Sequence, residues 1–144
     1  MFSRILIATD GSDVSLRAAA IAIDLAQRLS IGVYIYHVAL PYENAAFLTD
    51  IYSDPASYST QTLEYASRSL TDITALATAA NVPCESRYEH DSTPHEAIVA
   101  AAIDEHCDLI VMGSHGRRGL DRLLLGSETH KVLLNTTLAV LVCR

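Results

Sequence analysis

The stretch Arg4-Ile-Leu-Ile-Ala-Thr9 decides the fold, because it is apolar, too short for a helix, and followed by the turn residues Asp10-Gly11-Ser12. These features predict a buried β-strand. Apolar residues then recur at helical spacing, with Ser12 or Asp13 available as the N-cap and Ser30-Ile31-Gly32 as the end of the helix. The predicted apolar face of this helix consists of Val14, Ala18, Ile21, Leu25 and Leu29.

The same alternation continues along the chain. Further strands are predicted at residues 33–40, 84–90, 108–113 and 138–143. A second helix has the predicted apolar face Leu63, Ala66, Leu70, Ile73 and Ala77. A third helix opens with Thr93-Pro94-His95-Glu96, which has the pattern of a capping box, and runs to about His106. The fourth helix begins near Ser127 and carries Val132 and Leu133.

Strands that alternate with helices of this length need crossover connections, which favour parallel pairing and a sheet covered on both faces. We therefore expect a single α/β domain over residues 1–144 with a doubly wound, Rossmann-like parallel sheet. The segment 41–56 lacks clear periodicity and is longer than most connections. It is interpreted either as a lid or as ordinary surface.

Composition narrows the classes of function. The chain has 17 acidic residues against 10 Lys and Arg, a formal charge of −7, and no basic stripe, so nucleic acid is not an expected partner. No apolar run approaches the roughly 20 residues that span a membrane, and Met1 to Arg4 lead directly into a strand, which favours the cytoplasm. The three cysteines form no CxxC pair, and the six histidines show no metal spacing.

Ligands of open parallel sheets bind beyond the carboxyl ends of the strands, where the winding reverses. Two predicted strand ends contain glycine: Ala8-Thr9-Asp10-Gly11 and Met112-Gly113-Ser114-His115-Gly116. The second begins the pattern Gly113-x-x-Gly116, nine residues, then Gly126-Ser127 at a helix start. Glycine allows close approach of the backbone, and a helix N-terminus supplies N–H donors and partial positive charge. The pattern therefore suits a polyphosphate.

Other phosphate motifs and catalytic pairs fit less well. The glycines are too few for GxGxxG, and Gly126-Ser127 lacks the lysine of GxxxxGK[ST]. Ser114 and His115 are adjacent and are not expected to face each other, and no paired carboxylates mark a hydrolytic site. Enzymatic activity is left open, with slow ATP hydrolysis as its upper limit.

The glycine pattern resembles the nucleotide motif of the universal stress protein family. The resemblance covers nearly the whole chain, from residues 5–12 through 108–116 to the closing apolar strand. It implies a five-stranded sheet in the order 3-2-1-4-5 and a homodimer. In the branch that keeps the glycines it also implies bound ATP, with Mg²⁺ as an open question.

The resemblance also implies a role for each matching residue. Asp10 would contact the ribose or adenine, and the backbone of Val38 would contact adenine. Met112, Gly113, His115 and Gly116 would line the ribose and phosphates, and Gly126, Ser127 and Glu128 would hold the outer phosphates at the helix start. The full candidate set is Ala8, Thr9, Asp10, Val38, Met112, Gly113, His115, Gly116, Arg117, Gly126, Ser127 and Glu128.

Simpler roles remain open for several of these residues. Asp10 can instead cap the following helix, and His115 and the adjacent Arg117 and Arg118 can instead face solvent. Ala139 stands where the family often has proline. The carboxylate of Glu128 suits a helix N-terminus, yet it repels phosphate unless it points away or shares a metal ion.

Three functions are compatible with this set. The first is a nucleotide-dependent switch of the stress response that dimerises through the apolar strand 138–143. The second is a slow ATPase in which Ser127 and Asp10 place a metal ion and water. The third is an interaction module that has lost its nucleotide.

Overall fold

A five-stranded parallel sheet forms the centre of the protein, whose computed structural model describes residues 1–44, 54–115 and 125–144. The strand order is β3-β2-β1-β4-β5, and every neighbouring pair is parallel. The predicted fold class and strand order are therefore confirmed. The strands are β1 (Arg4–Thr9), β2 (Gly32–Ala39), β3 (Cys84–His90), β4 (Leu109–Gly113) and β5 (Ala139–Cys143).

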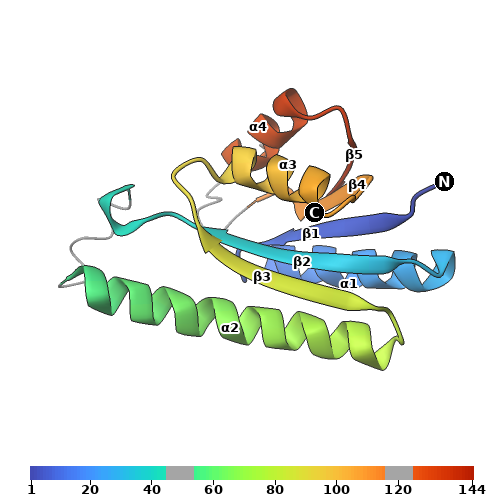
Figure 1. Ribbon diagram of the computed structural model, residues 1–144, viewed down its shortest axis with the longest axis horizontal. Coiled ribbons are helices and arrows are strands. Elements are labelled where there is room, and N and C mark those ends of the chain that lie inside the picture. Colours follow the sequence, from blue (N-terminus) through green and yellow to red (C-terminus); the bar gives the residue numbers. More distant parts are fainter. Residues whose placement is uncertain (45–53, 116–124) are drawn as a thin grey trace.

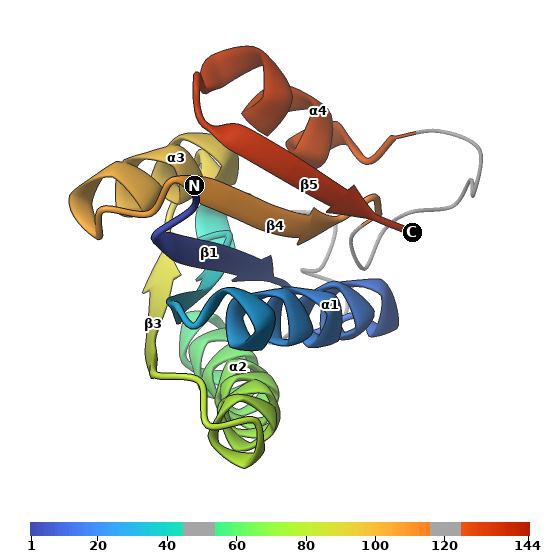
Figure 2. The same cartoon turned by 90° about the vertical axis from the view of Figure 1, so that its right-hand side faces the viewer.

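Helices cover both faces of the sheet (Figure 1). The helices α1 (Asp13–Leu29) and α2 (Pro55–Ala79) lie on one face, and α3 (Pro94–Asp104) and α4 (Ser127–Asn135) lie on the other (Figure 2). A short 3₁₀ helix, η1 (Tyr42–Asn44), follows β2. Two separate apolar clusters fill the layers, one around Ile5 and Ile7 and one around Leu6 and Ile110. Each fully buried side chain of this size contributes about 1.5–3 kcal/mol.

The face of α1 that packs on the sheet differs from the predicted one. Ser12 is the N-cap, and its hydroxyl accepts a hydrogen bond from the Ser15 backbone, as the sequence allowed. The buried side chains, however, are mostly alanines, while Ile21 is 47% exposed. Small residues let the helix lie close to the sheet, so the contact face contains few of the large residues used to find it. The buried residues of α1 are Ser15, Ala18, Ala19, Ala22, Ile23 and Ala26.

Helix α2 shows a smaller difference of the same kind. Ala66, Ile73 and Ala77 are buried as predicted, but Leu63 is 50% exposed. Tyr58 and Ser69 are buried on this helix instead. Asp54 is the N-cap of α2, so the segment 41–56 contains η1 and the helix start, while residues 45–53 lie outside the described part of the chain.

The predicted capping box of α3 is wrong, although the helix begins at Pro94 as expected. The Thr93 side chain makes no cap hydrogen bond; its hydroxyl donates to Asp91 Oδ1 at 3.0 Å. Asp91 Oδ1 also accepts the Thr93 N–H at 2.8 Å, which is the donor that Glu96 would accept in a capping box, so the reciprocal pair does not form. The helix ends at Asp104 rather than near His106.

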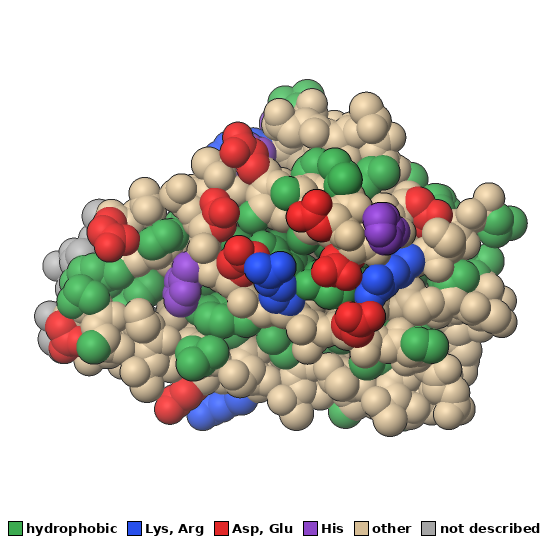
Figure 3. All heavy atoms as spheres, viewed as in Figure 1, with side chains coloured by type: hydrophobic (Ala, Val, Ile, Leu, Met, Phe, Trp, Pro, Cys, Tyr) green, Lys and Arg blue, Asp and Glu red, His purple; other side chains and the backbone are tan. Residues whose placement is uncertain are grey.

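The free edge at β3 is polar. Charged side chains of both signs gather across the middle of the face that Figure 3 shows. Arg4 pairs with Glu85 at 2.8 Å and with Glu105 at 3.4 Å, and Arg87 lies 3.5 Å from Glu89. Charge on an edge strand discourages pairing with a further strand. Within the described residues, no helix is both long and apolar enough to cross a membrane.

Asp108 ties the start of β1 to the start of β4. Its carboxylate accepts hydrogen bonds from the Ser3 hydroxyl at 2.7 Å and from the backbone N–H groups of Ser3 and Arg4. Burial acts to raise the pKa of Asp108, but these hydrogen bonds outweigh it, and the pKa lies below the ordinary value of 3.8.

We predict that Asp108→Asn lowers the free energy of unfolding by about 1 kcal/mol at pH 7, because charged acceptors form the stronger hydrogen bonds. A folded-state pKa below the unfolded one stabilises the protein above the unfolded pKa, and this contribution is lost as pH falls through the folded pKa. The difference in the free energy of unfolding between parent and variant should therefore become smaller below about pH 4. Urea unfolding at several pH values measures this difference. Asp104→Asn, at an exposed position, is the control, and equal stability of parent and Asp108→Asn at pH 7 contradicts the prediction.

Candidate functional site

The carboxyl ends of β1 and β4 lie side by side, because these two strands are parallel neighbours at the centre of the sheet. Their connections lead to opposite faces, so this is the place where the winding reverses (Figure 2). The predicted turn around Asp10 and the predicted loop after Gly113 therefore start from the same edge of the sheet.

The β1–α1 turn is organised by side-chain oxygens. Asp10 Oδ1 accepts a hydrogen bond from the Ser12 N–H at 3.0 Å, so the capping role that the sequence left open for Asp10 belongs to Ser12. Thr9 is buried, and its hydroxyl lies 3.0 Å from the Ser15 hydroxyl and accepts the Gly11 N–H. Thr9 thus shapes the turn from inside.

The N-terminus of α4 starts beside the end of β4. Its N-cap is Gly126, so no side chain caps the first turn. The Gly126 N–H donates to the carbonyl oxygen of Ser114, and a Cβ at Gly126 would lie 2.7 Å from that oxygen. Only glycine fits this contact without a shift of the backbone. The N–H groups of an uncapped first turn are donors for an anion.

Thr129 fastens α4 to β4, and sequence reasoning missed it. Its hydroxyl donates to the carbonyl oxygen of Gly113 at 2.9 Å, and the side chain is only 3% exposed. The Ser114 N–H donates to the carbonyl oxygen of Cys143 at 2.6 Å, so the last residue of β5 holds the same corner. The position of Thr129 on the inner side of the first helical turn is the only signal that could have identified it.

Ser114 and His115 face each other, contrary to the sequence expectation. The Ser114 hydroxyl lies 2.8 Å from His115 Nδ1. The strand ends at Gly113, so the alternation that separates adjacent side chains in a strand no longer applies. His115 Nε2 is buried and has no hydrogen-bond partner within residues 1–44, 54–115 and 125–144. No acidic side chain in that part of the chain therefore orients the histidine as in a catalytic triad.

Three candidate residues have side chains that pack in or against the core. The side chains of Ala8 and Met112 are buried in the cluster between the sheet and α3, and Val38 packs against the same cluster. Gly113 packs against α1, where a Cβ would lie 2.8 Å from Val14 Cγ1. Backbone contact is the role expected for Val38.

Glu128 and Ser127 differ in their surroundings. Ser127 is exposed at the first position of α4. The Glu128 carboxylate is already engaged: one oxygen accepts the backbone N–H of His95 at 3.0 Å, and the other lies 3.2 Å from Lys131 Nζ. Gly116 and Arg117 lie outside the described residues. Within the described residues, no group of three or more His, Cys, Asp or Glu side chains is arranged to hold a metal ion.

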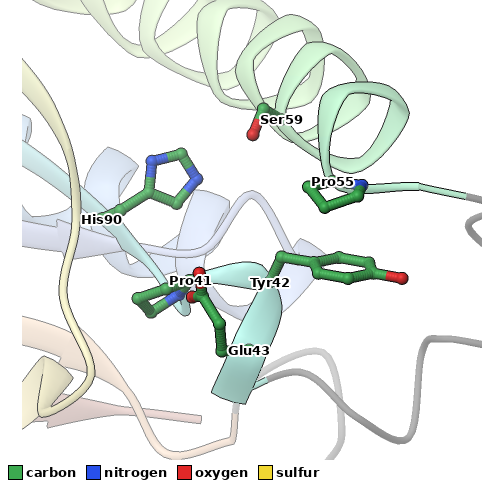
Figure 4. A pocket seen from close by; sticks show the side chains of 6 residues that line it. All are labelled: Pro41, Tyr42, Glu43, Pro55, Ser59 and His90. Atoms are coloured by element: carbon green, nitrogen blue, oxygen red, sulfur yellow. The ribbon is translucent and has the colours of Figure 1, made fainter.

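A hollow of about 220 Å³ opens beside the carboxyl ends of β2 and β3. Figure 4 shows its lining, which comes from the segment after β2, the start of α2 and the end of β3. The lining residues are Pro41, Tyr42, Glu43, Pro55, Ser59 and His90. None of the predicted nucleotide contacts is among them, and the glycine and helix N-terminus that suit phosphate are at β4. We therefore take the carboxyl ends of β1 and β4, called the β1–β4 edge from here on, as the candidate site.

A model of the universal stress protein family matches residues 1–144, the whole chain. The chain belongs to the universal stress protein family. Two universal stress proteins that match over all of both chains are one from Thermus aquaticus, 36% identical, and YxiE of Bacillus subtilis, 31% identical.

Solved structures of family members have the same fold. MJ0577, of Methanocaldococcus jannaschii, is 27% identical with a TM-score of 0.83, and the match covers 99% of this chain and 96% of that one. A universal stress protein in complex with cAMP is also 27% identical, with a TM-score of 0.68 and coverage of 98% and 95%.

We predict that Thr129→Val lowers the free energy of unfolding by about 1–3 kcal/mol, because a buried carbonyl oxygen loses its donor while the side-chain volume is kept. Thr129→Ser keeps the hydroxyl and should lose less. Urea unfolding followed by circular dichroism compares the two variants. A valine variant as stable as the serine variant contradicts the hydrogen bond as the cause.

Proposed function

We propose that this universal stress protein binds ATP at the β1–β4 edge and uses the bound nucleotide as a switch in a cytoplasmic stress response. The phosphates are held by the uncapped first turn of α4, which begins at Gly126. Asp10 and the Val38 backbone contact the nucleoside at the ends of β1 and β2. Gly116 and Arg117, from the loop between Gly113 and Gly126, complete the phosphate contacts.

The observation that carries this proposal is the close contact of Gly126 with the end of β4. This contact requires glycine at the N-cap, so no side chain caps the first turn of α4, and its N–H groups can donate to a phosphate chain. His115 Nε2, which is buried without a partner in the described residues, is the second polar group near the end of β4 that supports the proposal. The engagement of Glu128 with His95 and Lys131 supports the proposal as well, because it accounts for the carboxylate that otherwise repels phosphate. The relative in complex with cAMP adds support for an adenine nucleotide.

The switch requires that one conformation or assembly bind nucleotide more tightly than another. We propose that the assembly is a homodimer formed through β5. This strand is the second free edge of the sheet, and Val140, Leu141 and Val142 are partly exposed along it. An apolar edge of this kind needs a covering partner.

We predict that the purified protein binds ATP with an affinity near the micromolar range, about −8 kcal/mol, and that Gly126→Ala weakens this at least tenfold by filling the space against Ser114. Calorimetric titration measures the affinity. Gly32→Ala is the matched control, because its Cβ also crowds a backbone carbonyl, that of Pro83 at 3.2 Å, but lies at the opposite end of β2.

Melting curves without ligand must first show that both glycine variants are folded. If Gly126→Ala binds ATP within twofold of the parent's affinity, the nucleotide binds at another site. Mass spectrometry of nucleotide released from the purified parent distinguishes a binding protein from a module without ligand. A time course of phosphate release distinguishes the switch from a slow ATPase.

We predict that Val142→Lys weakens the dimer, because a charged side chain at the edge strand must be desolvated when two copies pair. Val142 is partly exposed and belongs to neither core cluster, so the monomer should stay folded. Sedimentation velocity over a range of concentrations measures the dissociation constant. Thr137→Lys adds the same charge outside the strand as a control, and a Val142→Lys dimer of unchanged strength excludes this interface.

A further inference from the structure

The first turn of helix α3 donates a hydrogen bond to a side chain of another helix, α4. Its own N-cap, Thr93, donates its hydroxyl to Asp91 and makes no cap hydrogen bond. Instead, Glu128 Oε2, from the first turn of α4, accepts the backbone N–H of His95 at 3.0 Å and lies 3.2 Å from His95 Nδ1. A carboxylate at a helix N-terminus is favourable to that helix. Glu128 therefore acts as the cap that α3 lacks.

This contact is partly shielded from water. The side chain of His95 is 15% exposed and that of Glu128 is 38% exposed. Lys131 Nζ holds the second carboxylate oxygen at 3.2 Å. With both oxygens engaged, the first turn of α4 is held against the first turn of α3.

The same helix start also reaches the end of β2. The Thr93 N–H donates to Asp91 Oδ1 at 2.8 Å, and the Asp91 N–H donates to the carbonyl oxygen of Ala39 at 3.0 Å. Ala39 follows Val38, the expected adenine contact. The start of α3 is thus hydrogen-bonded on one side to Glu128, at the proposed phosphate end of the site, and on the other side, through Asp91, to the end of β2 at the proposed base end.

We propose that Glu128 is a positioning residue for the nucleotide: its hydrogen bond to His95 fixes the first turn of α4 at the place where the outer phosphates bind. This inference rests on the proposed function. It predicts the opposite of simple repulsion between the Glu128 carboxylate and phosphate. Under repulsion, removal of the carboxylate strengthens ATP binding. Under positioning, removal of the acceptor oxygen weakens it.

The test is calorimetric titration of ATP and AMP into the full-length parent, Glu128→Ala and Glu128→Gln. We expect the alanine variant to bind ATP at least fivefold more weakly and AMP within twofold of the parent, because AMP lacks the outer phosphates. The glutamine variant keeps an oxygen for the His95 N–H and should bind ATP within twofold of the parent. Glu96→Ala removes a carboxylate from the same turn of α3, 68% exposed, and should change neither affinity.

Amide hydrogen exchange of the unliganded proteins provides a readout that needs no nucleotide. The His95 amide should exchange faster in Glu128→Ala and at the parent's rate in Glu128→Gln. If the parent binds no adenine nucleotide, the proposed function has failed and this inference fails with it. If the parent binds ATP, three results would overturn the positioning role alone. The first is an alanine variant that binds ATP as well as the parent or more tightly, and the second is a glutamine variant that binds it as weakly as the alanine variant. The third is His95 amide exchange in Glu128→Ala that is the same as in the parent.

Discussion

The contact between Gly126 and the Ser114 carbonyl is the constraint on which the site depends. A helix can start this close to the end of a strand only where the residue at its N-cap has no side chain. That requirement removes the usual capping group, since Ser, Thr, Asp and Asn all carry a Cβ. The first turn of α4 is therefore left with donors that its own N-cap cannot satisfy. The close packing of α4 on β4 and the uncapped donors of its first turn therefore have the same structural cause.

The corner that holds this contact is built from backbone carbonyls. Thr129 donates to Gly113, Ser114 donates to Cys143, and Gly126 donates to Ser114. Strands β4 and β5 and helix α4 thus meet at this corner through short polar contacts, next to the apolar contact that Val132 of α4 makes with the cluster around Ile110. None of these three hydrogen bonds uses a side chain from the segment between Gly113 and Gly126.

The sequence predicted the strands well, because apolar runs bounded by turn residues leave little choice of structure. All five strands lie within one residue of their expected bounds, and the strand order that the family resemblance implied is the observed one. The buried faces of α1 and α2 were predicted less well. The helical spacing of large apolar residues was used to predict the buried faces. A helix that lies close to a sheet instead buries alanine and leaves residues such as Ile21 and Leu63 exposed.

The helix start at the candidate site was predictable from local sequence, whereas the tertiary contacts around it were not. Gly126 and Ser127 were found because a glycine before a helix start has a conformational meaning within a few residues. The partner of Glu128 is 33 residues away, on a different helix, and no periodicity links the two positions. Thr93 and Glu96 had the spacing of a capping box, yet Asp91 accepts the backbone N–H of Thr93, and Glu128 accepts the backbone N–H of His95. Two acidic residues outside the motif thus compete with its members for the same donors, and a local motif does not reveal which acceptor succeeds once the chain is folded.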